Sequence, residues 1–329
     1  MHAPGAEAGP VTGSGPEGVD EDVEVAARVL GASARRDVPL APFTTYKVGG
    51  AAALHVSART HDDLRTVAEA LAASGLPLLV VGRGSNLLVS DAGFRGIALS
   101  VVEMTSDVDI DASSCLVEAG SAVRLPVLAR QTVRSGLTGF EWAVGVPGSV
   151  GGAVRMNAGG HGSDMSESLV DVRICDLSST GAPITVVPAD DLGLRFRGSG
   201  LEPESVVLSA RLRLEPGDPE AGERELADIV AWRRANQPGG QNAGSVFVNP
   251  VPGEVSAGAL VDGVGLRGMR LASAVVSDKH ANFIQADPGG SADDVVALMR
   301  HVRATVLEQT GFALRSEIQL VGFGDDPWG

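Results

Sequence analysis

The sequence predicts a mixed α and β fold with more than one domain, and three observations support this class. Segments with helical spacing of apolar residues alternate with short apolar runs typical of strands. The length of 329 residues is enough for two or three hydrophobic cores. Two glycine-rich segments, one near residue 84 and one at 144–162, have the composition of loops that let main chain approach a ligand.

The first third of the chain predicts a disordered leader and then a helix followed by strands. Residues 1–35 are rich in Gly, Pro and acidic residues, so we expect a disordered leader there. The segment 60–75 predicts a helix, because Thr60 can cap its start, apolar residues recur at i, i+3, i+4 and i+7, and Gly75 can end it. Short apolar runs predict strands at 76–82 and 96–102.

The last third of the chain also combines strands with a helix. Alternation over 206–214 predicts a strand with one wet face. The composition of 215–225, rich in Gly, Pro and acids, makes it the best linker candidate. A helix is expected between Ser291 and Gly311, followed by a strand at 316–323.

The net charge of −15 argues against nucleic acid or an anionic membrane as the main partner. An anionic substrate would need a locally cationic pocket, and Lys47 and Lys279 are the only two lysines. The N-terminus has no cationic region followed by an apolar run, and no segment approaches 18 apolar residues. We therefore expect a cytoplasmic protein.

The first glycine loop, "VVGRGSNLLVSD", does not fit the dinucleotide fingerprint of a Rossmann fold. That fingerprint needs a glycine at position 87 and a following helix, whereas the residue is Leu87 and the run continues as a strand. Consecutive main-chain N–H groups in such a turn can bind an anion. A tight hairpin without a ligand explains the same residues.

The second loop, "GVPGSVGGAVRMNAGG", has a turn at Pro147 and Gly148 and no side chains at Gly151 and Gly152. Two side-chain-poor loops, separated by about one βαβ unit, suggest an extended phosphate-bearing cofactor that lies across main chain. Two purely structural glycine turns remain the alternative.

Seven motifs occur in an order that resembles the UDP-N-acetylenolpyruvoylglucosamine reductase (MurB) family. They are "TTYKVGG", "VGRGSNLLVSD", "GVPGSVGGAVRMNAGGHG", "RFRGS", "AGSVFVNP", "SDKHANFI" and "LRSEIQLVG", and the resemblance runs from about residue 38 to 323. Ser245 follows Arg197 by 48 residues, which resembles the shorter form of the family that lacks an extra tyrosine-bearing loop.

The resemblance implies an α+β architecture. A two-lobed FAD-binding domain of the vanillyl-alcohol-oxidase (PCMH) type is expected over 36–215, with lobes of about 36–102 and 103–215. A C-terminal α+β substrate-binding domain is expected over 222–323, with a tail at 324–329. A monomer is expected.

The resemblance also implies a peptidoglycan-synthesis enzyme of cell-wall biogenesis. In that family NADPH reduces tightly bound FAD, and hydride passes from FAD N5 to C3 of UDP-N-acetylglucosamine enolpyruvate, which becomes UDP-N-acetylmuramate. The matching cofactor positions are Tyr46, Gly82, Gly84, Ser85, Asn86, Leu87, Gly145, Pro147, Gly148, Ser149, Gly151, Gly152 and Asn157.

Three positions match the family's catalytic residues. Ser245 corresponds to the donor of the proton to C2, and Arg197 and Glu317 correspond to the residues that hold and polarise the substrate carboxylate. From sequence alone, Arg197 also fits a solvated strand edge, Ser245 a turn, and Glu317 the wet face of a strand. The positions that match substrate contacts are Asn249, Lys279, His280 and Asn282.

Several positions depart from the family pattern. Asn236 and Val248 stand where the family has lysines, and His161 replaces an aromatic residue. Ala272 begins an altered "GGA" segment, and Arg315 replaces an acid. Because two cations near an expected diphosphate are missing, the substrate is expected to be an altered or more weakly bound nucleotide sugar. The alternatives are a divergent paralogue for another enolpyruvyl or nucleotide-sugar substrate and a flavin-binding protein without turnover.

Overall fold

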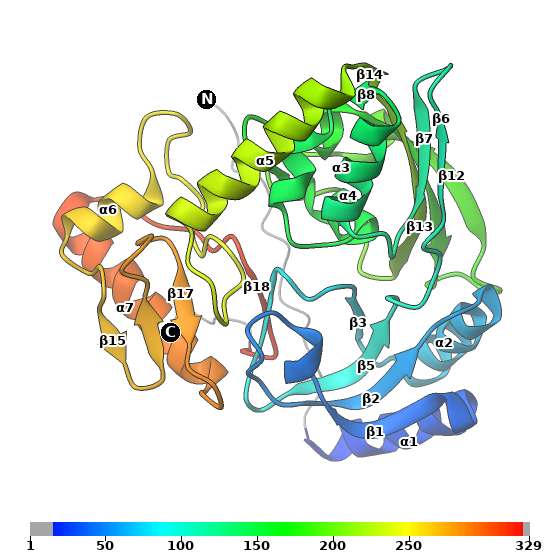
Figure 1. The fold of residues 1–329 in the computed structure, drawn as a ribbon. Coiled ribbons are helices and arrows are strands. Elements are labelled where there is room, and N and C mark those ends of the chain that lie inside the picture. Colours follow the sequence, from blue (N-terminus) through cyan, green and yellow to red (C-terminus); the bar gives the residue numbers. More distant parts are fainter. Residues whose placement is uncertain (1–15, 325–329) are drawn as a thin grey trace, which may run out of the picture.

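A computed structural model describes residues 16–324 and arranges them as two sheet-based lobes and a smaller C-terminal unit (Figure 1). The helices are α1 Pro16–Leu30, α2 His61–Ser74, α3 Leu125–Arg134, α4 Val150–Met156, α5 Pro219–Asn236, α6 Ala257–Gly263 and α7 Ala292–Thr310. None of the described helices is long and apolar enough to cross a membrane.

The first lobe is a four-stranded sheet in the order β1-β2-β5-β3, covered by α1 and α2. β1 runs antiparallel to β2, and β2 and β3 run parallel to β5 between them. The strands are β1 Ala34–Pro39, β2 Ala51–Ser57, β3 Leu78–Val81 and β5 Phe94–Ser100. The expected features of α2 are confirmed, because Thr60 caps its start in a capping box and Gly75 ends it in the left-handed conformation.

The predicted disordered leader is wrong where the structure can test it. Residues 16–30 form α1, and Ala26 and Leu30 are buried in the core of the first lobe. Ion pairs of Arg36 with Glu24 and of Arg95 with Asp20 tie the helix to the sheet. The apolar residues 23, 26, 27 and 30 have helical spacing, which the acidic composition conceals. Residues 1–15 lie outside the described part.

The second lobe is a five-stranded antiparallel sheet in the order β12-β11-β13-β7-β6, packed against α3, α4 and α5. The strands are β6 Val108–Asp111, β7 Leu116–Gly120, β11 Leu169–Asp176, β12 Ile184–Pro188 and β13 Ser205–Arg213. Smaller pairs join β8 Leu137–Thr138 to β14 Glu215–Pro216 and β9 Gly159–Gly160 to β10 Ser163–Asp164.

The linker predicted at 215–225 is wrong, because most of it is ordered as the start of α5. Asp218 caps this helix and Pro219 occupies its first turn. Leu226 and Ile229 then bury one face of α5 in the core of the second lobe. α5 runs from that lobe toward α6 (Figure 1), and the domain boundary near it stays a prediction.

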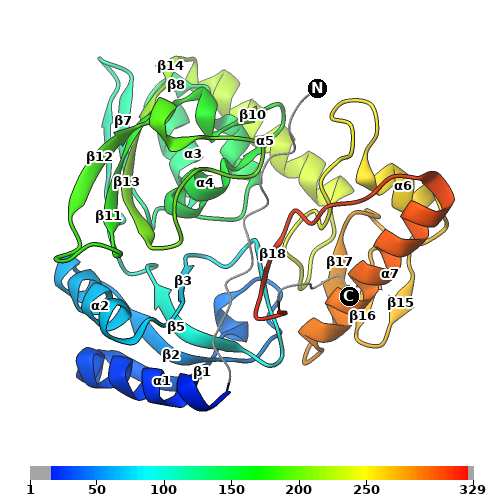
Figure 2. The same ribbon diagram turned by 180° about the vertical axis from the view of Figure 1, so that it is seen from behind.

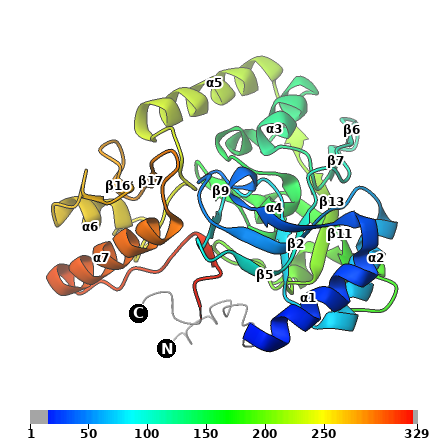
Figure 3. The same ribbon diagram turned by 90° about the horizontal axis from the view of Figure 1, so that it is seen from below.

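The C-terminal unit contains α6, α7 and a small sheet in the order β15-β16-β17. Its strands are β15 Arg270–Leu271, β16 Ala274–Val276 and β17 Ile284–Ala286. α7 begins after Ser291 and ends at Gly311, as predicted. Seen from below, this unit lies on the opposite side of the molecule from α1 and α2 (Figure 3).

Several contacts join the C-terminal unit to the first lobe, and three of them involve β18, Asp91 and Tyr46. β18 Gln319–Val321 returns between the two halves and pairs in parallel with β4 Leu87–Val89 (Figure 2). The Asp91 carboxylate accepts hydrogen bonds from Ser291 and from main-chain N–H groups at the start of α7. The third contact is made by Tyr46, whose hydroxyl donates to the Ile284 carbonyl at 3.0 Å.

Candidate functional site

The two glycine loops, separate in sequence, meet in the structure. A Cβ atom on Gly82 would lie 3.3 Å from the Ser149 hydroxyl, and one on Gly148 would lie 3.4 Å from the Ser85 hydroxyl. The second loop is held in place by main-chain bonds, including those from Gly151 N–H to the Ser121 carbonyl at 3.0 Å and from Leu125 N–H to the Gly148 carbonyl at 3.1 Å. The two loops are therefore close enough to contact one ligand together, as expected from the sequence.

The first loop requires glycine at position 84. Gly84 has a φ of +59°, and a Cβ atom there would lie 2.0 Å from the Phe43 carbonyl oxygen. Leu87 follows as the first residue of β4. The loop thus turns tightly against neighbouring main chain and leads directly into a strand, as expected.

These loops fit an extended, phosphate-bearing group such as FAD. Space at Gly152 is open, with no heavy atom within 4 Å of a Cβ built there. Ser149 stands at the N-cap position of α4, yet its hydroxyl does not cap that helix. Side-chain-poor main chain with a hydroxyl not used for capping is the donor set that a phosphate group needs. Gly145 ends the 3-10 helix Glu141–Gly145 and is buried, with His161 Nε2 3.1 Å from a Cβ built there, and Pro147 is exposed in the turn that follows.

Tyr46 is the exception among the predicted cofactor residues. Its side chain is fully buried in the core of the C-terminal unit, and its hydroxyl is bonded to Ile284. The prediction that this side chain contacts FAD is therefore corrected. The side chain instead links the first lobe to the C-terminal unit. A contact through the main chain of this segment stays a prediction.

The structure brings Arg197 and Glu317 into direct contact. Arg197 Nε donates to Glu317 Oε1 at 2.6 Å, although the residues are 120 positions apart. The exposed fractions of the two side chains are 28% and 14%, so water screens this pair less than a surface pair. Burial raises the pKa of Glu317, and the charge and hydrogen bond of Arg197 oppose that rise.

Ser245 reaches the same place through the main chain. The Glu317 N–H donates to the carbonyl of Val246, the next residue after Ser245, at 2.8 Å. Asn86, in the first glycine loop, donates from Nδ2 to the Glu317 carbonyl at 3.2 Å. The structure therefore brings the Arg197 and Glu317 side chains and the segment that carries Ser245 together beside the first glycine loop, and we call Arg197, Ser245 and Glu317 the candidate trio.

Arg197 occupies the tip of a tight turn rather than an open strand edge. Arg195 and Gly198 exchange main-chain hydrogen bonds at 3.0 and 3.1 Å, and Arg197 has a φ of +56°. A left-handed conformation in a non-glycine residue costs roughly 1–3 kcal/mol, which the surrounding structure must offset. Its guanidinium also lies over the ring of Phe196, 5.1 Å from the centroid.

Phe196 was not singled out from the sequence. Its side chain is 58% exposed although it is a large apolar residue next to a candidate catalytic arginine. The sequence signal that could have found it is an aromatic residue between two arginines in "RFRGS".

The predicted substrate residues are divided between two places. Asn249 Oδ1 accepts from the Ala257 N–H at the start of α6, and His280 lies against Gly258 of the same helix. Lys279 instead donates from Nζ to the Arg234 carbonyl near the end of α5. The side chains of Lys279 and Asn249 thus contact different helices, α5 and α6 respectively.

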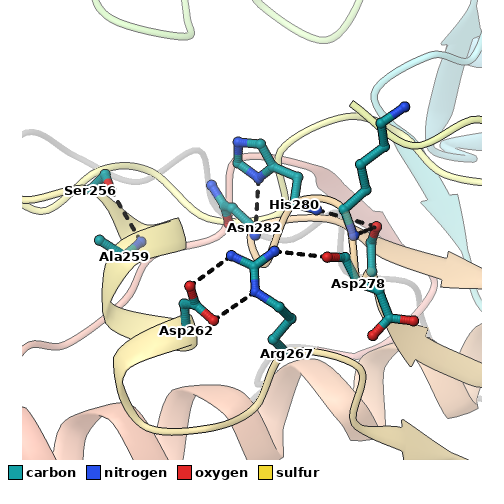
Figure 4. Close-up of polar contacts among 9 residues, drawn as sticks. Ser256, Ala259, Asp262, Arg267, Asp278, His280 and Asn282 are labelled. Carbon is teal, nitrogen blue, oxygen red and sulfur yellow. Dashed lines mark hydrogen bonds and ion pairs between the residues drawn. The ribbon is translucent and has the colours of Figure 1, made fainter. Parts of the chain in front are cut away.

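The loop that carries His280 is held by its own polar contacts (Figure 4). His280 Nδ1 accepts from the Asn282 N–H at 3.2 Å, and the Arg267 guanidinium bonds both carboxylate oxygens of Asp262 and the Asp278 carbonyl. Burial, followed by the charge of Arg267, lowers the pKa of His280. The imidazole is therefore favoured in its neutral form.

The departures from the family pattern also have defined places. Asn236 donates to the Trp232 carbonyl within α5 and is exposed. His161 packs edge-on against Trp232 with ring centroids 5.1 Å apart, and burial followed by the charge of Arg233 lowers the pKa of His161. Val248 pairs through its N–H with the Arg315 carbonyl.

Comparison with known proteins covers nearly the whole chain. A family model described as "FAD binding domain" matches residues 52–182, and one described as "UDP-N-acetylenolpyruvoylglucosamine reductase, C-terminal domain" matches residues 236–321. The chain is 40% identical over 291 residues to the UDP-N-acetylenolpyruvoylglucosamine reductase of Synechococcus sp. (strain RCC307), covering 88% of this chain and 94% of that one. It is 41% identical to the same reductase of Heliobacterium modesticaldum, covering 86% and 89% of the two chains.

A solved structure agrees with these relatives. The crystal structure of UDP-N-acetylenolpyruvylglucosamine reductase (MurB) from Thermus caldophilus superposes with a TM-score of 0.73 at 32% identity, covering 88% of this chain and 99% of that one. The predicted combination of an FAD-binding domain with a C-terminal α+β domain is confirmed. The chain belongs to the UDP-N-acetylenolpyruvoylglucosamine reductase family, whose members are FAD-binding oxidoreductases.

Proposed function

We propose that the protein is an NADPH-dependent reductase that converts UDP-N-acetylglucosamine enolpyruvate to UDP-N-acetylmuramate for peptidoglycan synthesis. The observation that carries the proposal is the contact of Arg197 with Glu317 beside the Ser245 segment. This cluster borders the first glycine loop, which supports a site where the candidate trio acts next to FAD held by that loop. The reaction is proposed for the cytoplasm and for a monomer.

Arg197 binds the substrate carboxylate in this proposal. Its Nε is engaged by Glu317, which leaves the two Nη groups to face a carboxylate in the planar fork geometry. Reduction at C3 of the enolpyruvyl group places negative charge at C2, and this charge spreads into the same carboxylate. A guanidinium held at that carboxylate stabilises the charge as it develops.

Glu317 orients Arg197 and holds a proton more readily than an ordinary glutamate. Burial raises its pKa, whereas Arg197 opposes that rise. A carboxyl group beside a substrate carboxylate is tolerated when the two share a proton, because the like-charge repulsion is then removed. Glu317 is thereby suited to polarise the substrate carboxylate.

Ser245 donates the proton to C2. A serine hydroxyl is a weak acid, so it can protonate only a strongly basic carbon, which is the kind of centre that hydride addition creates. The half-buried position of Ser245 limits competition from bulk water.

The cofactor would be held by the two glycine loops. FAD, when bound, supplies hydride transfer from NADPH to C3 of the enolpyruvyl group. Gly82, Gly148 and Gly152 would offer main chain without side-chain obstruction, and Ser85 and Ser149 would offer hydroxyl donors.

A divergent substrate is the second candidate, and the absence of charge at two positions where the family has lysines favours it. Asn236 and Val248 provide no charge at the two family lysine positions. Lys279 lies at the Arg234 carbonyl, two residues before Asn236, and can offset part of this loss. Replacing one charge-assisted hydrogen bond costs about 1.5–3 kcal/mol, or roughly ten- to a hundredfold in affinity.

Anaerobic half-reactions test the proposal. NADPH should bleach the bound flavin of the purified protein, and UDP-N-acetylglucosamine enolpyruvate should restore its colour. Ser245→Ala should keep the bleaching step and lose the restoring step. Restoration at the normal rate in this variant would show that Ser245 is not the proton donor, and restoration by a different enolpyruvyl compound alone would support the second candidate.

A further inference from the structure

The side chain of Asn282 is hydrogen-bonded to the segment that carries Ser245. The side chain is 4% exposed, its Oδ1 accepts from the Phe247 N–H at 3.0 Å, and its Nδ2 donates to the Phe247 carbonyl at 2.8 Å. The Val246 N–H donates to the Asn282 carbonyl at 2.8 Å. The Asn282 amide thus bonds both the N–H and the carbonyl of Phe247, as a neighbouring strand would. Phe247 lies two positions after Ser245. The predicted substrate contact of this side chain is corrected accordingly.

Asn157 makes an equivalent connection to the Arg197 turn. It is 4% exposed and has a φ of +39°, which asparagine tolerates better than most residues. Its Nδ2 donates to the Arg195 carbonyl at 3.3 Å and to Asp164 at 3.2 Å, and its Oδ1 accepts from the Ser166 N–H at 3.0 Å. Because the donor and acceptor atoms of the amide are both engaged, this side chain also serves protein main chain rather than the predicted cofactor.

Asn86 completes the pattern at Glu317. Its Nδ2 donates to the Glu317 carbonyl at 3.2 Å, and its own carbonyl accepts from the Gln319 N–H at 2.8 Å. Each member of the candidate trio therefore has one asparagine bonded to its own main chain or to main chain two residues away. The three asparagines come from segments far from those they hold, at separations of 231, 38 and 35 residues.

We infer that Asn86, Asn157 and Asn282 are positioning residues, each of which fixes the main chain of one member of the candidate trio. The inference rests on the proposed function. An asparagine amide supplies a strong donor without charge, so it can fix a carbonyl close to the Arg197–Glu317 pair and leave the local field unchanged. An aspartate of the same shape would turn a second acceptor toward the carbonyl and lose the bond.

The isosteric variants Asn157→Asp and Asn282→Asp test the inference. Substrate-driven flavin reoxidation should fall by about ten- to a hundredfold, because small misplacement of reacting groups carries penalties of that order. FAD content per chain and NADPH-driven reduction should stay within about twofold, since the amides do not hold the cofactor. Asn157→Asp should raise the KM for the substrate through Arg197, whereas Asn282→Asp should lower kcat and enlarge the solvent isotope effect through Ser245.

The matched control is Thr105→Val. Thr105 also donates from its side chain to a distant main-chain carbonyl, that of Leu208 at 2.8 Å, but it holds no segment of the candidate trio. This variant should keep both half-reactions. Where an Asp variant does not fold, Asn157→Gly and Asn282→Ser remove the amide without adding charge and are measured in the same way.

A second readout is independent of turnover. Amide hydrogen exchange of the Phe247 N–H should accelerate in Asn282→Asp, and that of the Gly198 N–H should accelerate in Asn157→Asp, while Thr105→Val changes neither. Unchanged exchange would overturn the inference, as would a loss of FAD with equal losses in both half-reactions. A fully active Ser245→Ala would refute the proposed function instead, so the two failures are distinguishable.

Discussion

Replacing Arg197 with lysine separates the charge of this side chain from its planar shape. Arg197→Lys keeps a cation beside Glu317 but loses the fork that can bind Glu317 through Nε and a carboxylate through the two Nη groups at once. The side chains of the pair are only 28% and 14% exposed, so the lost bond is not fully replaced by water. One charge-assisted hydrogen bond is worth about 1.5–3 kcal/mol.

That free energy sets the expected rate. Because 1.4 kcal/mol corresponds to a tenfold change, substrate-driven reoxidation should slow by roughly ten- to a hundredfold. Anaerobic stopped-flow spectroscopy of the flavin measures this step apart from reduction by NADPH, which should change less than about twofold. The left-handed φ of +56° adds the same strain for either residue, so a change in the free energy of unfolding reports the weakened bond to Glu317.

Arg195→Lys provides the matched control. This arginine lies in the same turn, is exposed, and donates to the Gly193 carbonyl. Normal reoxidation in both variants would refute the role of the planar fork. Equal loss in both half-reactions of Arg197→Lys would instead assign Arg197 a structural role in the turn.

Three further perturbations follow from the described contacts. Because burial raises the pKa of Glu317, the folded state binds the carboxyl proton more tightly than the unfolded state does. The stability of the wild type relative to Glu317→Gln should therefore fall as pH rises from the ordinary pKa of 4.5 through the raised pKa. Urea unfolding at a series of pH values measures this difference. Tyr46→Phe leaves a buried main-chain carbonyl of β17 without its donor and should cost about 1–3 kcal/mol in the free energy of unfolding, with FAD content unchanged. Gly84→Ala forces Cβ against the Phe43 carbonyl and should abolish FAD retention. Gly75→Ala places its Cβ in open space and should lower the free energy of unfolding by only about 1 kcal/mol, because of the left-handed φ. Flavin absorbance of the purified variants distinguishes them.

Local chemistry made some elements predictable. α2 and α7 were readable because Thr60, Gly75, Ser291 and Gly311 lie next to the apolar periodicity that they bound, so each signal is contained in one short window. The tight first loop was likewise evident from its glycines.

Elements whose apolar content is diluted were missed. α1 hides four apolar positions in an acidic segment, and α5 begins in a stretch whose composition resembles a linker. The Asp218–Pro219 pair is a helix-start signal that could have identified α5.

Side-chain roles that depend on distant partners could not be read from local sequence. Motif position alone assigned Asn157 to the cofactor and Asn282 to the substrate, because the carbonyls that they bind belong to other segments. The contact of Arg197 with Glu317 spans 120 residues, and the family resemblance suggested only that both residues act on one substrate carboxylate.

The pairing of β18 with β4 has a consequence for biogenesis. Leu87–Val89, which leaves the first glycine loop, gains its strand partner from residues 319–321, and Glu317 arrives in the same stretch. A ribosome must therefore translate almost the whole polypeptide before β4 can gain this partner and Arg197 can contact Glu317. A chain that ends before residue 317 lacks both Glu317 and the segment that pairs with β4, so neither contact can form during its synthesis.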